Sequence, residues 1–216
     1  MEAYSIDDGT ALVKAARNAI ELFIRSPNSS KNIVKESLGP FGQRNGVYVT
    51  IMHYPTRELR GRSGFARPVS DVREMVVDAA IAAAFEDPRF VSVTLNELQH
   101  ITIEVCLLSD PLELRGGKFK RLRAIDPTIH GLMAEYGIRQ GAMLPQELGK
   151  PLSKRELLEG VCAKAGLPRN HWTQPNIKLY MFETAAFAEQ APEGPVREIR
   201  HKREPERKAA QAAQKI

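Results

Sequence analysis

Hydrophobic residues recur along the chain with two different periods, which predict a mixture of helices and strands. Helical spacing of apolar residues predicts helices over residues 9–25, 70–87 and 153–165. The second and third of these segments begin around Asp71 and Ser153, each followed three residues later by a glutamate. That spacing is typical of a capping box, so both segments have a defined helical start.

Alternating or β-branched residues predict strands over residues 46–54, 58–65, 100–108, 128–136, 138–144 and 177–187. We expect the first two strands to pair as a hairpin, and the fourth and fifth to turn at Gly137. Thr94 and Glu97 indicate a short capped turn, residues 116–123 indicate a loop or a connection between lobes, and residues 32–38 fit a short helix or a loop. Helices and strands do not alternate regularly, so the predicted fold class is α+β, with a mostly antiparallel sheet flanked by helices.

The apolar pattern ends after Ala188, which divides the 216 residues into a domain and a tail. We predict a domain over residues 1–188, with any smaller lobe inside it, and a basic, charged C-terminal tail over residues 189–216. The net charge is +5, and residues 196–216 hold seven Lys or Arg against three Glu. The rest of the chain is therefore almost neutral, and only the tail is a candidate for binding RNA or an acidic partner. It lacks aromatic residues for base stacking, which favours a solvated extension.

The composition excludes several classes of protein. No apolar run approaches the ~20 residues of a membrane-spanning helix, and the N-terminal MEAYSIDDGT lacks the basic and apolar regions of a secretory signal. Cys106 and Cys162 lie in segments with an apolar pattern, which favours buried thiols over a disulfide. We therefore expect a cytoplasmic protein that does not bind a membrane.

The familiar catalytic and cofactor motifs do not occur in the sequence. The five histidines are scattered, without a pair at helical spacing and without a Cys-X-X-Cys, so we predict no metal site. Ser63 is not part of a Gly-X-Ser-X-Gly turn, and neither a Walker A loop nor a Gly-X-Gly-X-X-Gly follows a predicted strand. We therefore predict no cofactor, and the sequence identifies no catalytic residue.

The strongest candidate site is the run ELRGRSGF at residues 58–65. Arg60 and Arg62 alternate along a predicted strand, so we expect their side chains on the same side. Two guanidinium groups could hold a phosphate or carboxylate, and the glycines would let a ligand or another backbone approach. The candidate ligand-binding residues are Arg60, Gly61, Arg62, Ser63, Gly64 and Arg67. The alternative is that these arginines form surface ion pairs with nearby acidic residues.

An ordered series of motifs resembles the AMMECR-domain family. The matching segments are GVYVTI (46–51), LRGRSG (59–64), AFEDPRF (84–90), LNELQHITIEVCLLSDPLEL (95–114), MLPQ (143–146), LLEGVCAKAGLP (157–168) and LYMFET (179–184). The resemblance covers residues 9–188 and leaves out the tail. It implies an α+β fold with a larger lobe built on a sheet and a second, smaller lobe. It implies no established activity, because catalytic and regulatory roles, one of them linked to nucleic acid, have both been suggested for the family.

One segment departs from the family pattern. The family hexapeptide usually reads Leu-Arg-Gly-Cys-Ile-Gly, whereas Arg62 and Ser63 stand here in place of the cysteine and the isoleucine. A thiol-based mechanism at this position is therefore not expected in this chain. Attention moves to Arg60, Gly61 and Gly64, which match the pattern.

Three hypotheses about function remain open at this point. The first is a binding or regulatory role, with an anionic ligand or partner segment at LRGRSG and a cleft that includes His53, His130, Pro145 and Gln146. The second is an enzyme of transferase or hydrolase type, with Arg60 as an anion clamp and His53, His130 or Glu104 as general base. The third is RNA binding through the basic tail.

Overall fold

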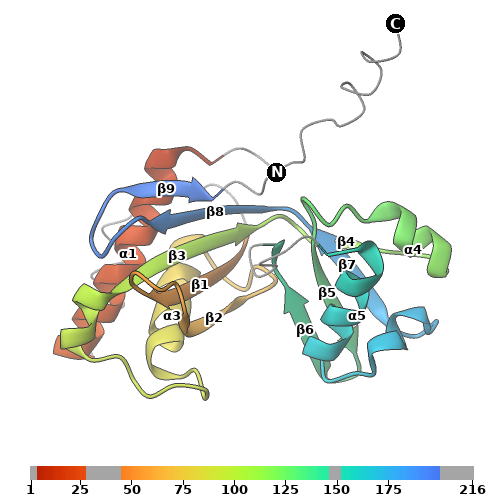
Figure 1. Cartoon of the computed structure of the whole chain (residues 1–216), viewed down its shortest axis with the longest axis horizontal. Coiled ribbons are helices and arrows are strands. Elements are labelled where there is room, and N and C mark those ends of the chain that lie inside the picture. Colours follow the sequence, from red (N-terminus) through yellow and green to blue (C-terminus); the bar gives the residue numbers. More distant parts are fainter. Residues whose placement is uncertain (1–3, 28–44, 146–151, 200–216) are drawn as a thin grey trace, which may run out of the picture. The chain divides into compact units, whose positions relative to one another are not determined.

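The computed structural model describes residues 4–27, 45–145 and 152–199, which form two compact units. Unit 1 consists of the described part of Met1–Pro111 together with Thr184–Ile199, and unit 2 consists of the described part of Leu112–Glu183. Each unit has its own antiparallel sheet and its own cluster of buried apolar residues (Figure 1). The predicted α+β class with a second, smaller lobe is confirmed.

The sheet of unit 1 has five antiparallel strands in the order β2-β1-β3-β8-β9. They are β1 (Gly46–His53), β2 (Leu59–Phe65), β3 (Ile101–Leu108), β8 (Thr184–Glu189) and β9 (Val196–Ile199). The predicted hairpin of the first two strands is confirmed. β3 is the central strand, and all of its residues are buried, including the polar Thr102 and Glu104. Both faces of this strand are therefore shielded from solvent.

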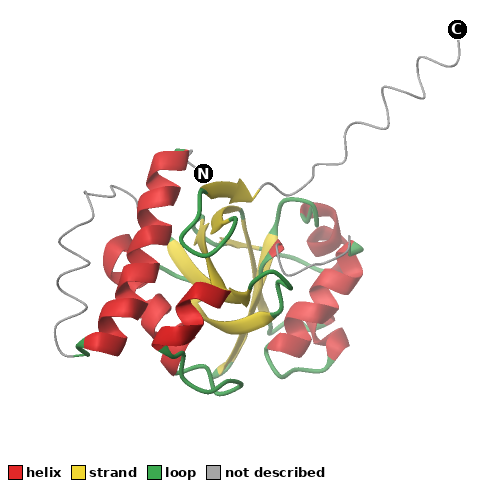
Figure 2. Cartoon of the chain, turned by 60° about the vertical axis from the view of Figure 1, so that its left-hand side comes forward, coloured by secondary structure: helices red, strands yellow, loops and turns green. Residues whose placement is uncertain are grey.

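Two helices, α1 (Ile6–Arg25) and α3 (Val72–Phe85), pack against each other and against one face of this sheet (Figures 1 and 2). α1 starts in a capping box, in which Ser5 Oγ accepts from the backbone N–H of Asp8 and the Asp8 carboxylate accepts from that of Ser5. α3 starts at the predicted cap, where the Asp71 carboxylate accepts from the backbone N–H of Arg73. The apolar sides of both helices and of the sheet form the main core, whose burial is the largest stabilising contribution.

A buried ion pair links α1 to strand β8 of the sheet. The guanidinium of Arg17 donates through Nε and Nη2 to both carboxylate oxygens of Glu189 on β8, each at 2.6 Å. Its nitrogens also donate to the carbonyls of Leu98 and Ile101, and Glu189 accepts from the backbone N–H of Ile103. The pair is thus fully hydrogen-bonded at a depth where an unpaired charge would be strongly destabilising.

The sheet of unit 2 has four antiparallel strands in the order β4-β7-β5-β6. They are β4 (Leu112–Glu113), β5 (Gly131–Tyr136), β6 (Arg139–Met143) and β7 (Lys178–Phe182), and the described helical segments are α4 (Lys118–Ala124), α5 (Lys154–Lys164) and η3 (Arg169–Thr173). The predicted hairpin of β5 and β6 turns at Gly137, whose φ of +59° favours glycine. The predicted capping box of α5 is confirmed, and apolar residues of this helix share a core with the buried Trp172.

Two predictions about elements were wrong. Residues 177–187 are not one strand, because β7 ends at Phe182, β8 starts at Thr184, and the two belong to different sheets. Apolar alternation runs through both strands and carries no information about which sheet each one joins. Residues 118–123, predicted as part of a loop, belong to α4, whose Lys, Arg, Leu and Ala residues favour a helix.

The segment predicted as a tail begins with ordered structure. Residues 190–195 lead from β8 into β9, and β9 pairs with β8 as an antiparallel edge strand. Residues 200–216 lie outside the described residues, as do residues 32–38, which were expected to form a helix or a loop. The basic excess of the tail lies in residues 200–216, which hold six Lys or Arg and two Glu.

The predictions of a short capped turn and of buried thiols are confirmed in the described residues. The short η1 (Leu95–His100) precedes β3 and is capped by Thr94 with Glu97, as predicted. Cys106 and Cys162 are buried and form no disulfide, and burial raises the pKa of the Cys162 thiol to about 11. Among the helices of the described parts, none combines the length and the apolar character needed to cross a bilayer.

Candidate anion site on the polar face of unit 1

Polar residues from three neighbouring strands share the face of the unit 1 sheet that points away from α1 and α3. In the strand register, Tyr48 lies opposite Cys106, and Thr50 lies opposite both Arg62 and Glu104. Residues opposite each other on paired strands present their side chains to the same face. The alternate residues of β1 lie in the core beneath the helices. We call Tyr48, Thr50, Arg62, Glu104 and Cys106 the polar face.

Arg62 supplies the positive charge of the polar face. Its guanidinium carbon lies 5.0 Å from the centroid of the Tyr48 ring, within the range of cation–π attraction. Burial lowers the pKa of Arg62, and the neighbouring Tyr48, Cys106 and Glu104 groups oppose that shift. Burial also raises the pKa of the Tyr48 phenol, and the charge of Arg62 opposes it. Arg62 stays protonated at neutral pH, so the face presents a planar cation stacked on an aromatic ring.

Asp87, just after α3, anchors the backbone of Arg62. Its Oδ2 accepts from the backbone N–H of Arg62 at 2.9 Å, and its two carboxylate oxygens accept from the Arg89 guanidinium at 2.9 and 2.7 Å. The Arg89 side chain, helped by the backbone N–H groups of Arg89 and Arg62, lowers the pKa of Asp87 from 3.8 to about 2 against the effect of burial. The Asp87 side chain is only 3% exposed. An ionised, buried carboxylate therefore fixes the main chain at Arg62.

The glycines of the LRGRSG segment permit close packing between backbones. A Cβ added to Gly61 would collide with the carbonyl oxygen of Ala83 on α3. One added to Gly64 would collide with the backbone of Val47 and Tyr48 on the paired strand. The sequence predicts a bulge, a ligand or another backbone near these glycines, and the structure has both an approaching backbone and a bulge beside Gly61.

Arg60 lies at a β-bulge and is engaged inside unit 1. The pairing of β2 with β1 shifts between Ile51 and Met52, which leaves Arg60 as the extra residue. Its Nε and Nη2 donate to the two carboxylate oxygens of Glu97 at 2.9 and 3.3 Å, and Nη2 also donates to the carbonyl of Val91. Burial raises the pKa of Glu97, but the bonds and charge of Arg60 and the bonds from Thr94 outweigh it and lower that pKa overall.

The two arginines of the segment therefore have different surroundings. Arg60 faces Glu97 and the Phe90 ring, whose centroid is 5.9 Å away, whereas Arg62 lies over Tyr48. The prediction that both point the same way assumes unbroken alternation along β2, and the bulge at Arg60 breaks it. The contacts described for the two guanidinium groups thus have no partner in common.

The other predicted site residues of unit 1 lie around the ends of the two paired strands. Ser63 lies opposite Val49, a residue of the core beneath the helices. His53 ends β1 and is half-buried, and Arg67 follows β2 and is exposed. None of these side chains belongs to the polar face as it is defined by the strand register.

The remaining members of the predicted cleft belong to unit 2. His130 accepts a hydrogen bond at Nδ1 from the backbone N–H of Asp126, at 3.0 Å, and Pro145 is buried. Gln146 lies outside the described residues. The cleft that would join these residues to His53 stays a prediction.

Sequence reasoning missed part of the polar face. Tyr48 and Thr50 are not among the predicted site residues, although the register of the predicted hairpin could have placed them beside the arginines. Asp87 carries no local signal beyond ending a helix. Within residues 4–27, 45–145 and 152–199, there is no group of three His, Cys, Asp or Glu residues placed to hold a metal ion.

One protein family matches most of this chain. The AMMECR1 family matches residues 13–187. The chain belongs to the AMMECR1 family. Its relatives include protein MK0488 of Methanopyrus kandleri, 37% identical over 200 residues that cover 91% of this chain and 96% of that protein. An AMMECR1 relative from Thermococcus gammatolerans is 39% identical over 203 residues, with 90% and 97% covered.

A crystal structure of a similar protein supports the same assignment. Uncharacterized protein PH0010 from Pyrococcus horikoshii matches with a TM-score of 0.80 and 33% identity, over 90% of this chain and 97% of that one. The family resemblance inferred from the motifs and the predicted α+β fold are both confirmed. These AMMECR1 relatives carry generic names, so membership of the family does not itself assign an activity to the polar face.

Proposed function

We propose that this AMMECR1 family protein has a binding or regulatory role, in which Arg62 on the polar face holds an anionic ligand or an acidic partner segment. The observation that carries the proposal is the guanidinium of Arg62, stacked on Tyr48 and fixed at its backbone by Asp87. A planar guanidinium held in one orientation suits the geometry of a carboxylate or phosphate. Both Arg62 and Tyr48 are only half-buried, which keeps the stacked pair within reach of a ligand.

Arg60 is not the anion contact in this proposal. It is 4% exposed, and two of its three nitrogens already donate to Glu97 and Val91. An anion at Arg60 would have to compete with a carboxylate that is in place. The role of anion contact, predicted for the segment as a whole, is therefore proposed for Arg62.

The proposal is tested by titrating inorganic phosphate, citrate and an acidic phosphoserine peptide into the full chain, with backbone amide NMR shifts as the readout. We expect saturable shifts at Tyr48, Arg62 and Gly64 for at least one probe. Arg62→Leu should weaken that binding by about tenfold or more, since a charge-assisted hydrogen bond is lost. The affinity of Arg62→Lys should lie between those of the wild type and Arg62→Leu, because lysine keeps the charge but lacks the planar guanidinium.

Arg25→Leu is the matched control. Arg25 lies on α1, pairs with Glu21 and has a 56% exposed side chain, so its loss removes one positive charge from unit 1 without touching the polar face. Its affinity for each probe should stay near that of the wild type. Unchanged binding in Arg62→Leu, or an equal loss in both variants, would overturn the proposal.

A second candidate function is an enzyme of the transferase or hydrolase type. It is favoured by Glu104, a carboxylate that is 4% exposed and shares the polar face with Arg62. In this scheme Arg62 binds the substrate anion, and Glu104 moves a proton as general base. A panel of ester and phosphoester substrates should reveal turnover that falls at least about a hundredfold in Glu104→Gln. Equal turnover in the variant, or none in the wild type, would remove this candidate.

RNA binding through the tail is a third possibility to be tested directly. A chain truncated after residue 199 loses six Lys or Arg and two Glu. If the tail binds RNA, the truncation should weaken binding to a single-stranded RNA and flatten its dependence on salt. Equal affinity and salt dependence in the truncated chain would exclude the tail as the contact.

A further inference from the structure

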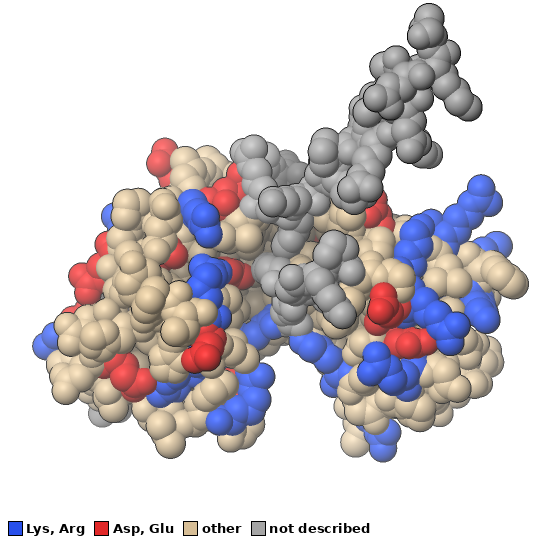
Figure 3. Space-filling model, in the orientation of Figure 1, with Lys and Arg blue, Asp and Glu red and all other residues tan. Residues whose placement is uncertain are grey.

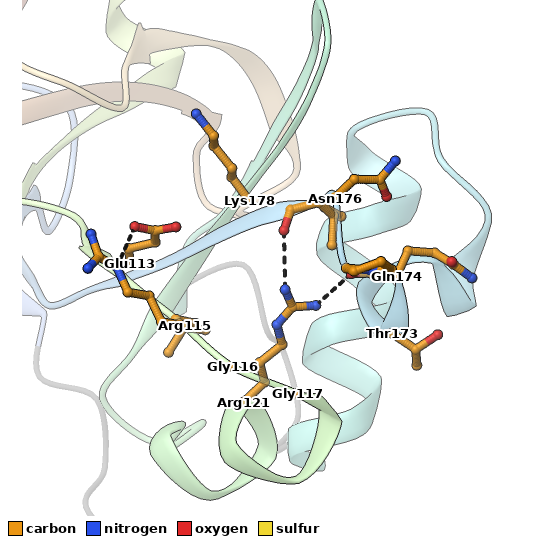
Figure 4. Close-up of a pocket in the computed structure, with 12 residues that line it drawn as sticks. Glu113, Arg115, Gly116, Gly117, Arg121, Thr173, Gln174, Asn176 and Lys178 are labelled. Atoms are coloured by element: carbon orange, nitrogen blue, oxygen red, sulfur yellow. Dashed lines mark hydrogen bonds and ion pairs between the residues drawn. The ribbon is translucent and has the colours of Figure 1, made fainter.

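Unit 2 has a pocket of about 580 Å³ between two of its segments (Figure 4). Residues 113–117 join β4 to α4 on one side, and residues 173–178 join η3 to β7 on the other. The side chain of Arg121 extends from α4 between them (Figure 4). A pocket of this volume is typical of sites for small molecules.

Arg121 is held rigidly by neutral groups. Its Nη1 donates to the carbonyls of Trp172 and Gln174, and its Nη2 donates to that of Ile177. These bonds orient the guanidinium, but a carbonyl does not neutralise its charge. The Nε of Arg121 is buried and has no hydrogen-bond partner among the described residues.

Unlike Arg17, Arg121 has no carboxylate partner among the described residues. Both residues are 6% exposed, and Arg17 meets both carboxylate oxygens of Glu189. In the described part of the chain, no carboxylate pairs with Arg121, and burial lowers its pKa. A buried cation without a counter-charge is costly, and a buried donor without a partner calls for a specific one. An anion in the pocket would supply the counter-charge that Arg121 lacks.

The other residues that line the pocket also favour an anion. Arg115 and Lys178 also line it, and its single acidic residue, Glu113, is paired with Arg115 at 2.8 Å. A Cβ added to Gly117 would meet no atom within 4 Å, so there is open space at this turn. The described residues of unit 2 include eleven Lys or Arg and six Asp or Glu. Figure 3 shows blue side chains gathered over this unit.

We propose that the unit 2 pocket binds a small molecule that bears a phosphate group. Arg121 attracts the phosphate through a charge that no carboxylate of the described residues offsets, and Arg115 and Lys178 add charge at the rim. Phosphate is favoured over a single carboxylate because three basic residues line the pocket and only one acidic residue offsets them. This site lies in a different unit from the polar face, and it does not depend on the function proposed there.

The test is a titration of the full chain with inorganic phosphate, glucose 6-phosphate and citrate, followed through the backbone amides of Gly116, Gly117 and Gln174. These amides separate the pocket from the polar face, whose own amides are recorded in the same spectra. We expect saturable shifts with the two phosphate probes and at least about tenfold weaker binding in the double variant Arg115→Gln/Lys178→Gln.

Two further variants make the result decisive. Arg123→Gln/Lys154→Gln removes the same charge from exposed positions of unit 2 that do not line the pocket, and should bind within about threefold of the wild type. Arg121→Met should abolish binding wherever its spectrum shows a folded protein, and the rim variant tests the site if it does not fold. Absence of saturable binding, equal loss in the control variant, or binding of citrate alone would overturn the proposal.

Discussion

Arg60 and Arg62 are two residues apart on β2, yet their side chains have different partners. Arg60 is 4% exposed and pairs with Glu97, whereas Arg62 is half-buried over Tyr48. The bulge at Arg60 separates the two environments, because it interrupts the alternation of side chains along the strand. Arg60 is thus the more buried of the two cations, and Arg62 is the more exposed one.

Replacing Arg60 by alanine should therefore destabilise the fold. The change leaves the Glu97 carboxylate, whose side chain is 30% exposed, without its counter-charge. We expect the free energy of unfolding to fall by about 2–4 kcal/mol in urea denaturation. Arg73→Ala, which breaks the more exposed pair with Asp71, should lower the free energy of unfolding much less than Arg60→Ala does. Similar small losses in both variants would contradict the structural role of Arg60.

Asp87 should make stability depend on pH in the acid range. Its pKa is about 2 in the folded protein against an ordinary value of 3.8, so the stabilisation is complete above pH 3.8 and is lost as the pH falls toward 2. The difference corresponds to roughly 2 kcal/mol. Asp87→Asn should lower the free energy of unfolding by that order at pH 6 and show a flatter decline between pH 4 and pH 2. Parallel pH profiles for the two proteins would contradict this account.

At the scale of elements, the hairpin of β1 and β2 depends on glycine where backbones meet. Gly61→Ala should destabilise the protein by about 2–3 kcal/mol, because the new Cβ would collide with a carbonyl oxygen of α3. Gly117→Ala is the matched control, since its Cβ would meet no atom within 4 Å and its φ is −79°. That variant should change the free energy of unfolding by less than about 1 kcal/mol. Thermal and urea unfolding of the two variants measure the difference.

Elements with a strong local period could be predicted from the sequence, and their partners could not. The α1, α3 and α5 helices follow from helical spacing and caps, and the two hairpins follow from strand patterns and turn residues. The division of residues 177–187 into β7 and β8 could not be predicted, because alternation is the same whichever sheet a strand joins. α4 was missed since its seven residues are too few for a clear period.

The same limit applies to the candidate site. The LRGRSG segment could be found from its glycines and arginines. Gly61 lies against the backbone of α3, and Arg62 lies over the Tyr48 ring. The partner of Arg60, however, is 37 residues away in a separate turn. The bulge that separates Arg60 from Arg62 depends on pairing with β1, which local sequence does not specify.

At the scale of the whole molecule, charge is divided between the units. The described residues of unit 1 hold ten Lys or Arg and fifteen Asp or Glu, and those of unit 2 hold eleven and six. The near-neutral body inferred from composition is thus a sum of one acidic and one basic part. Each proposed anion site uses arginines that its own unit supplies, and only the site in unit 2 lies in a basic unit.

Unit 2 should fold without unit 1. Its segment, Leu112–Glu183, is continuous in sequence and has a separate core that includes Leu157, Val161 and Trp172. We expect the isolated segment to give a dispersed amide NMR spectrum and a cooperative thermal transition, as small single-core domains do. A collapsed spectrum without a cooperative transition would mean that the two cores are not independent.

The most direct test of the central claim is the dissociation constant of the acidic phosphoserine peptide, read from the amides of the polar face well below the unfolding temperature of each variant. The account predicts that Arg62→Leu binds about tenfold or more weakly, while the less stable Arg60→Ala binds within about threefold of the wild type. The reverse order, with binding lost in folded Arg60→Ala and kept in Arg62→Leu, would contradict it.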